Sequence, residues 1–161
     1  MSAKSSLGGN VSISTVRLTP QPGDHGVPLM CKAFSPNLSG SVLQDQVTLT
    51  VHFVPVATIS VSGTDDEDTV AEGGSITFTC HLQANPPVYN ITWFHNGRAL
   101  KRRRNRLGVG IGGLRLGQSG NATLRLAKVG ADMRGLYTCV GSNLEGDGQS
   151  NALNLNVKCE Y

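Results

Sequence analysis

The sequence predicts an all-β chain whose larger part is a two-sheet β-sandwich. Three observations lead to this prediction. Short segments of alternating apolar and polar residues recur along the chain, separated by turns that contain glycine, proline or asparagine. Two of these segments each carry a cysteine, and the single tryptophan lies between the two cysteines in the sequence. No segment shows a helical period.

The composition agrees with this fold class. A length of 161 residues allows one or two domains and at least one sizeable core. Only 16% of the residues are charged, and 20 are glycine, which suits strands and turns better than helices. The net charge of +3 is modest and does not by itself indicate a nucleic-acid partner.

Only a few strands are predicted in the first part of the chain, residues 1–55. Residues 1–10 are small and polar, and we expect them to be disordered. Further along, alternation predicts strands at 11–18, 27–33 and 47–53, with turns at 20–23 and 35–41. Cys31 lies in the middle strand of the three. Val54-Pro55-Val56 follows, and because so few residues separate neighbouring strands there, we place a semi-rigid domain boundary at this point.

The second part, residues 56–158, is predicted to contain all the strands of a sandwich. They are expected at 57–61, 75–82, 90–95, 122–126, 135–141 and 153–157, with a turn over 143–148. Asn96-Gly97 is the strongest short hairpin signal in the sequence.

Two of these strands point a cysteine to the same side as their apolar residues. In the segment 75–82, Cys80 alternates in step with Ile76, Phe78 and Leu82, and Cys139 shares a face with Tyr137. Trp93 is the large aromatic between them. This pattern predicts a disulfide across a two-sheet core, with Trp93 and Tyr137 as core residues. Such a bond persists only in an oxidising compartment, so we expect an extracellular domain.

The order Cys80, Trp93, Cys139, with Tyr137 two residues before the second cysteine, resembles the immunoglobulin superfamily. The stretches WFHNGRAL, GNATLRL and GLYTCVGSNLEGDGQSNALNLNVK are similar to Sidestep- or nephrin-type adhesion proteins. The resemblance implies one complete immunoglobulin-like domain at 56–158, preceded by the last strands of another at 1–55. It also implies that Cys31 pairs with a cysteine upstream of this sequence, whereas Cys159 has no assigned role.

The same resemblance implies a function. Tandem immunoglobulin domains on a single-pass cell-surface receptor would bind other immunoglobulin-superfamily proteins in cell adhesion or axon guidance, with no catalysis and no cofactor. Neither a membrane span nor a signal peptide is visible in the sequence, so we interpret it as an excerpt of the ectodomain. The alternative is a structural spacer domain in a tandem array.

Four Asn-x-Ser/Thr triplets support an extracellular glycoprotein. They begin at Asn10, Asn37, Asn90 and Asn121, and chance alone predicts about two in a chain of this composition. At least one is therefore expected to be accidental. A glycan on Asn90 would shield one end of the strand that carries Trp93, so we expect docking to centre nearer the hairpin at Asn96–Lys101.

A basic run follows the hairpin: Lys101, Arg102, Arg103, Arg104 and Arg106. The favoured interpretation is a solvated loop. The alternative is an anion-binding site for heparan sulfate or for an acidic protein face, because arginine forks fit sulfates. Nucleic acid is less suitable as a partner because no aromatic residues lie between the cations to stack on bases.

Other motifs carry little weight. Gly108, Gly110 and Gly113 spell G-x-G-x-x-G, the basis of a rival enzyme or cofactor-binding hypothesis, but the motif lacks a preceding buried strand and a following helix. The acidic run 65–68 lacks the spaced ligands of a calcium loop. The histidines show no metal spacing, and no nucleophile motif is present. We therefore predict no catalytic residues and no metal site.

Overall fold

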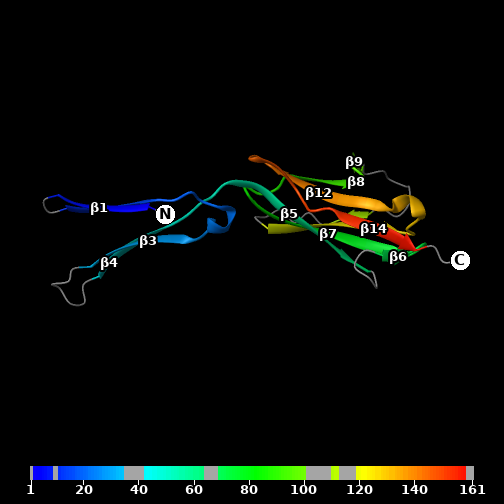
Figure 1. Cartoon of the computed structure of the whole chain (residues 1–161), viewed down its shortest axis with the longest axis horizontal. Helices are drawn as coiled ribbons and strands as arrows, with labels where there is room; N and C mark the ends of the chain where they lie inside the picture. Colours follow the sequence, from blue (N-terminus) through cyan, green and yellow to red (C-terminus); the bar gives the residue numbers. More distant parts are fainter. Residues whose placement is uncertain are drawn as a thin grey trace. The chain divides into compact units, whose positions relative to one another are not determined.

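A computed structural model describes residues 2–8, 11–34, 42–63, 69–100, 110–112 and 119–158 of the chain. It divides into two compact units, Met1–Val51 and His52–Tyr161, here called unit 1 and unit 2 (Figure 1). In the ranges just given, the only helices are short 3-10 turns, and none is long and apolar enough to cross a membrane.

Unit 1 consists of two antiparallel hairpins. One pairs β1 (Ser2–Gly8) with β2 (Val11–Arg17), and the other pairs β3 (Pro28–Phe34) with β4 (Val42–Thr48). A 3-10 turn, η1 (Pro22–Asp24), lies between the hairpins in the sequence.

Two sequence-based expectations for unit 1 differ from the structure. Residues 2–8, expected to be disordered, form β1, because main-chain pairing with β2 along its length needs no alternation of apolar side chains. The strand expected at 47–53 is instead β4 at 42–48, set by its pairing with β3. The alternation after Thr48 continues through residues 49–52, which connect two strands, and into Phe53, where the next strand begins. The pattern therefore predicted one strand where the structure has a connecting segment.

Unit 2 is a sandwich of two sheets. The four-stranded sheet has the order β10 (Gly110–Gly112), β11 (Ser119–Ala127), β7 (Ser75–Asn85) and β5 (Phe53–Ser62). The six-stranded sheet has the order β6 (Thr69–Ala71), β14 (Leu153–Lys158), β12 (Gly135–Asn143), β8 (Asn90–His95) and β9 (Arg98–Ala99), with β13 (Gly146–Gln149) also paired to β12. A 3-10 turn, η2 (Ala131–Met133), precedes β12.

The core of unit 2 lies between these sheets. Alternate residues of β7 point inward and are buried: Ile76, Phe78, Cys80 and Leu82. Leu124 and Leu126 of β11 and Leu155 and Val157 of β14 join the same cluster. The predicted alternation thus gives the observed inward faces, and the predicted all-β immunoglobulin-like sandwich is confirmed.

The segment Val54-Pro55-Val56, where the sequence suggested a domain boundary, lies inside β5. The register of β5 against β7 shifts between Phe53 and Val56, and such an irregularity tolerates a proline that cannot donate to the ladder. A Cβ atom built on Gly148 would lie 1.6 Å from the carbonyl oxygen of Pro55, so β13 passes against this part of β5. The units divide between residues 51 and 52. The assignment of 1–55 to a partial domain stays a prediction.

The turns and short strands of unit 2 agree only in part with the sequence-based expectations. Asn96 and Gly97 have φ values of 48° and 75°, which confirms the predicted hairpin turn between β8 and β9. The turn expected over 143–148 is shorter, because β12 extends to Asn143 and Gly146 pairs with it as the start of β13. β6 was not predicted, since three residues are too few for an alternation signal.

Candidate recognition surface

The disulfide joins the two sheets. Cys80 of β7 and Cys139 of β12 are bonded, with their Cα atoms 6.3 Å apart and a separation of 59 positions in the sequence. Both are fully buried, and Trp93 lies directly opposite Cys139 on the neighbouring strand β8. The predicted bond is therefore present. Within the described residues, the buried indole Nε1 of Trp93 has no hydrogen-bond partner, so Trp93 contributes here through packing.

Tyr137 fixes the start of β12. Its ring stacks between Phe78, with centroids 4.6 Å apart, and His95, with centroids 4.5 Å apart. Its hydroxyl donates to the carbonyl oxygen of Met133 at 2.8 Å, which is the tyrosine-corner geometry that the sequence implied. Burial, with a smaller contribution from the nearby Asp132 carboxylate, raises the pKa of Tyr137 to about 12.

The turn after β8 is tied to the same place. The backbone N–H of Asn96 donates to the carbonyl oxygen of Leu136 at 2.8 Å, and the Leu136 N–H donates to Asn96 Oδ1 at 2.9 Å. His95 Nε2 lies 2.8 Å from the carbonyl oxygen of Arg134. The hairpin tip is therefore held rigidly against β12. The hairpin signal predicted the turn, but nothing in the sequence pattern pointed to these cross-strand bonds.

The outer face of the six-stranded sheet combines apolar and neutral polar side chains. On β8 and β12 the outward residues face each other in pairs, Phe94 with Thr138 and Thr92 with Val140. Leu136 is 51% exposed beside the Asn96 turn and is a diagonal neighbour of Phe94. We call Phe94, Leu136 and the Asn96–Gly97 turn the hairpin patch.

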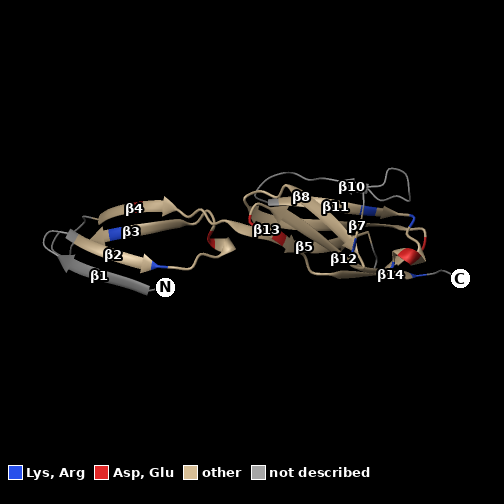
Figure 2. Cartoon of the chain, turned by 90° about the horizontal axis from the view of Figure 1, so that it is seen from above, with Lys and Arg blue, Asp and Glu red and all other residues tan. Residues whose placement is uncertain are grey.

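Charge is almost absent from the sheets of unit 2. Every residue of β5, β7, β8 and β12 is described, and none is Lys, Arg, Asp or Glu. Figure 2 accordingly shows these strands in tan. The charged residues of the described strands of unit 2 lie instead on β9, β11, β13 and β14 (Arg98, Arg125, Asp147 and Lys158), so recognition centred on β8 and β12 would depend on shape, apolar contact and neutral hydrogen bonds.

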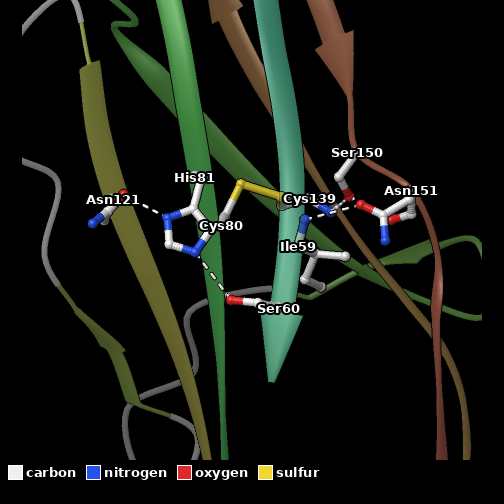
Figure 3. The surroundings of a disulfide bond; sticks show 8 residues. All are labelled: Ile59, Ser60, Cys80, His81, Asn121, Cys139, Ser150 and Asn151. Carbon is white, nitrogen blue, oxygen red and sulfur yellow. Dashed lines mark hydrogen bonds between the residues drawn. A yellow bond between two sulfur atoms is a disulfide. The ribbon is translucent and has the colours of Figure 1, made fainter. Parts of the chain in front are cut away.

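The outer face of the four-stranded sheet is different, because it carries a chain of hydrogen-bonded polar side chains. His81 of β7 lies between Ser60 of β5 and Asn121 of β11 (Figure 3). Ser60 Oγ is 3.0 Å from His81 Nε2, and Asn121 Oδ1 is 2.9 Å from His81 Nδ1. All three residues are exposed. Sequence reasoning found Asn121 but not its partners, because the contacts depend on strand register.

At the other end of the six-stranded sheet, Asn143 joins three segments. It is only 3% exposed, and its Nδ2 donates to the carbonyl oxygens of Phe53 at 2.8 Å and Pro86 at 2.9 Å. Its Oδ1 accepts from the N–H groups of Glu145 and Gly146. No sequence signal indicated this role, since asparagine in a glycine-containing turn normally indicates only a surface loop.

The family model for the immunoglobulin domain matches residues 54–143, just over half of the chain. The chain belongs to the immunoglobulin superfamily. The sheet orders agree with this membership, since β10-β11-β7-β5 and β14-β12-β8 correspond to the D-E-B-A and G-F-C sheets of an immunoglobulin domain.

Similar proteins include several adhesion proteins. Cell adhesion molecule 4 of Homo sapiens is 31% identical over 134 residues, covering 83% of this chain and 30% of that protein. Kin of IRRE-like protein 2 of Mus musculus is 36% identical over 84 residues, covering 52% and 11%. Nephrin of Rattus norvegicus is 26% identical over 97 residues, covering 60% and 8%, which agrees with the nephrin-type resemblance. The chain thus spans less than a third of these relatives.

A solved structure shows the same fold. The complex of Dpr2 Ig1-Ig2 with DIP-Theta Ig1-Ig3 contains a chain that superposes with a TM-score of 0.55 at 22% identity, covering 81% of this chain and 41% of that one. The M1 domain from titin superposes with a TM-score of 0.50 at 22% identity, covering 66% and 96%.

The structure describes two of the four predicted glycosylation residues. Asn90 on β8 and Asn121 on β11 are exposed, and Asn90 Nδ2 donates to Thr92 Oγ1 of its own triplet at 3.3 Å. Asn10 and Asn37 lie outside the described residues. Their glycosylation, like that of Asn90 and Asn121, stays a prediction.

Several other predicted features also lie outside the described residues. They are the basic run Lys101, Arg102, Arg103, Arg104 and Arg106, the acidic run 65–68, Cys159, and Gly108 and Gly113 of the glycine motif, whose Gly110 begins β10. Heparan sulfate binding therefore stays a prediction from the sequence. Cys31 of unit 1 is described and has an exposed free thiol. The described ranges hold no group of three or more potential metal-ligating side chains.

Proposed function

We propose that unit 2 is an extracellular recognition module of a cell-adhesion or guidance receptor, and that it binds other immunoglobulin-superfamily proteins through the hairpin patch. In this proposal, residues 1–55 are the last strands of a preceding immunoglobulin domain, and Cys31 pairs with a cysteine of that domain's earlier strands. The module performs no chemistry and acts by binding alone.

Two observations support an extracellular location. The Cys80–Cys139 disulfide is buried between the sheets, and such bonds form and persist in oxidising compartments. The similar proteins include Cell adhesion molecule 4, which matches over most of this chain. Both observations support the proposal that the chain is part of the ectodomain of a membrane-anchored glycoprotein.

The observation that carries the choice of surface is the exposure of Leu136 beside a rigid turn. Leu136 is half exposed on an antiparallel strand, next to half-buried Phe94, on a face without charged residues on β8 and β12. The main-chain and side-chain bonds of Asn96 hold the turn in place before any partner arrives. Apolar anchors on a pre-organised surface are what protein interfaces use, because little ordering entropy is lost on binding.

The position of Asn90 is compatible with this surface. Asn90 and Asn96 lie at opposite ends of β8, about 20 Å apart at the rise of an extended strand. A glycan on Asn90 would therefore cover the far end of the sheet and leave the hairpin patch accessible.

Binding of the whole 161-residue chain to immobilised ectodomains tests this function. The probes are the chain itself and the ectodomains of Cell adhesion molecule 4, nephrin and Kin of IRRE-like protein 2. We expect binding to at least one of them, and Leu136→Glu is expected to weaken it at least about tenfold by placing a charge in the apolar contact. The matched control is Thr58→Glu, which places the same charge on the exposed outer face of β5.

The outcomes separate the hypotheses. Binding that Leu136→Glu abolishes and Thr58→Glu preserves supports the hairpin patch. Equal effects of the two variants on binding would indicate that the recognition surface lies elsewhere. Failure to bind any probe would favour a structural spacer domain.

A further inference from the structure

The Ser60–His81–Asn121 chain crosses three neighbouring strands in one row. Asn121 and Thr58 are the register partners of His81 on the strands either side of β7, and Ser60 is two residues along from Thr58. All of these side chains lie on the solvent side of the sheet, away from the disulfide one residue before His81. The hydrogen bonds therefore form on an open surface, not in a cleft.

The direction of these bonds orients the Asn121 amide. Because Asn121 Oδ1 can only accept, His81 Nδ1 carries the proton and donates to it, and His81 Nε2 then accepts from the Ser60 hydroxyl. Figure 3 shows the amide oxygen of Asn121 turned toward His81 and the amide nitrogen turned away from it. The His81 bond thus uses the amide oxygen of this exposed residue and not its amide nitrogen.

Asn121 begins the triplet Asn121-Ala122-Thr123, an acceptor sequence for N-glycosylation. We propose that Asn121 carries an N-glycan and that this glycan covers the outer face of the four-stranded sheet, which leaves the six-stranded sheet as the face open to partners. The proposal rests on the proposed function in one respect, because the chain must pass through the secretory pathway.

The chemistry is compatible with the folded geometry. An oligosaccharide on a polyprenyl diphosphate is the donor: a bond forms between Asn121 Nδ2 and the anomeric carbon, and the bond from that carbon to the diphosphate oxygen breaks. Nδ2 loses one proton, and the polyprenyl diphosphate leaves with the bonding electrons. The product is still an amide, so Oδ1 remains an acceptor and the His81 bond is retained.

The surface around Asn121 is mainly polar. Outward side chains there include the hydroxyls and neutral amides of Thr58, Ser60, Thr79, Gln83 and Thr123, and the same face also carries the exposed Val56 of β5 and Arg125 of β11. The outer face of the six-stranded sheet instead presents Phe94, Leu136 and Val140. Asn121 and the hairpin patch lie on different sheets, so the glycan and the partner would not compete for the same face.

Site occupancy is the first test. The full chain is secreted from mammalian cells behind a leader peptide, and its glycans are removed by peptide-N-glycosidase in heavy-oxygen water, which labels each formerly glycosylated asparagine as aspartate. We expect labelled Asn121 in most molecules. Thr123→Ala is expected to abolish the label and Thr123→Ser to retain it. Secreted protein that is labelled at another triplet but unlabelled at Asn121 would overturn the proposal without touching the proposed function.

Shielding of the sheet is the second test. In a Cys31→Ser, Cys159→Ser background, single cysteines replace Thr58 on the four-stranded sheet or Leu136 on the hairpin patch, and each protein is treated with a bulky polyethylene-glycol maleimide. The reaction at Thr58→Cys is expected to be several-fold slower with the glycan than in the Thr123→Ala variant. The rate at Leu136→Cys is expected to be unchanged. Equal rates at Thr58→Cys with and without the glycan would contradict the assignment of faces.

Discussion

The hydroxyl of Tyr137 donates a hydrogen bond to the carbonyl oxygen of Met133, 2.8 Å away, and so ties the first residues of β12 to the turn η2. Two contacts to the end of β8 and the turn after it come from the residues between Met133 and Tyr137. The carbonyl oxygen of Arg134 lies 2.8 Å from His95 Nε2, and the N–H of Leu136 donates a hydrogen bond to Asn96 Oδ1. A core tyrosine thereby supports the rigid turn on which the hairpin patch depends. Because the patch is built on the core, its geometry should respond to changes at Tyr137.

Removing the Tyr137 hydroxyl should destabilise unit 2. In Tyr137→Phe the ring still fills the core, but the Met133 carbonyl loses its donor, at a cost of about 1–2 kcal/mol in the free energy of unfolding. Urea unfolding followed by the fluorescence of Trp93, the single tryptophan, measures this change in unit 2 alone. Tyr89→Phe is the matched control, because the Tyr89 side chain is 63% exposed and its variant should unfold like the parent chain.

The raised pKa of Tyr137 predicts a loss of stability in alkali. Tyrosine has a pKa of 10.0 in the unfolded chain and about 12 at this position, because burial disfavours the phenolate. The contribution is fully present below pH 10. It falls as pH rises from 10 to about 12, where the unfolded state loses its proton first. The free energy of unfolding should therefore drop less over this range in Tyr137→Phe than in the parent, and equal slopes would contradict the assignment.

Much of the fold of unit 2 could be predicted because its strands obey a local rule. Ile76, Phe78 and Cys80 alternate with polar residues, and the same alternation decides which side of β7 faces the core. Asn96-Gly97 likewise encodes its turn in two residues. What could not be predicted is non-local. β1 and β6 owe their existence to pairing with strands elsewhere in the chain, and the position of Pro55 inside β5 depends on a register shift.

The candidate surfaces were predictable only in part, for the same reason. The Asn90 and Asn121 triplets are visible in the sequence, but His81 becomes a partner of Asn121 only through the register of β7 against β11. Leu136 has no special sequence signal, and its exposure follows from the inward direction of Tyr137 beside it. The alternation pattern in one sequence predicts which face of the sheet a side chain lies on. It does not predict which residue of the neighbouring strand lies beside it.

Loss of the disulfide should be one of the larger single effects on stability. The bond joins cysteines 59 positions apart in the sequence, and by the chain-entropy model this constraint on the unfolded state is worth roughly 4 kcal/mol. The double variant Cys80→Ala, Cys139→Ala should therefore shift the urea midpoint of unit 2 strongly downward. Cys31→Ala provides the control, because the exposed thiol of Cys31 lies in unit 1, and its removal should leave the midpoint unchanged.

Gly148 should tolerate no side chain. A Cβ atom there would lie 1.6 Å from the carbonyl oxygen of Pro55, so β13 and β5 would have to separate. We expect Gly148→Ala to lower the free energy of unfolding by at least about 2 kcal/mol, as overpacked sites do. A Cβ atom on Gly23 of unit 1 meets nothing within 4 Å, so Gly23→Ala should leave the stability of the chain nearly unchanged. Similar unfolding midpoints for the two variants would show that β13 does not pass so close to β5.

Asn143 provides the sharpest test of how the far end of unit 2 is held together. In Asn143→Ala, the carbonyl oxygens of Phe53 and Pro86 each lose the hydrogen bond from Asn143, and the turn after β12 loses the acceptor for two N–H groups. A hydrogen bond contributes about 0.5–1.5 kcal/mol to stability, and this variant loses four of them, so we expect a loss of at least about 2 kcal/mol in the free energy of unfolding. Asn143→Asp distinguishes the two sides of the amide, because it keeps the acceptor for the turn but removes both donors. It should therefore be nearly as destabilised as Asn143→Ala at neutral pH. Asn154→Ala is the matched control, because Asn154 is an exposed residue of β14. An Asn143→Asp protein as stable as this control would show that the contacts to Phe53 and Pro86 contribute little.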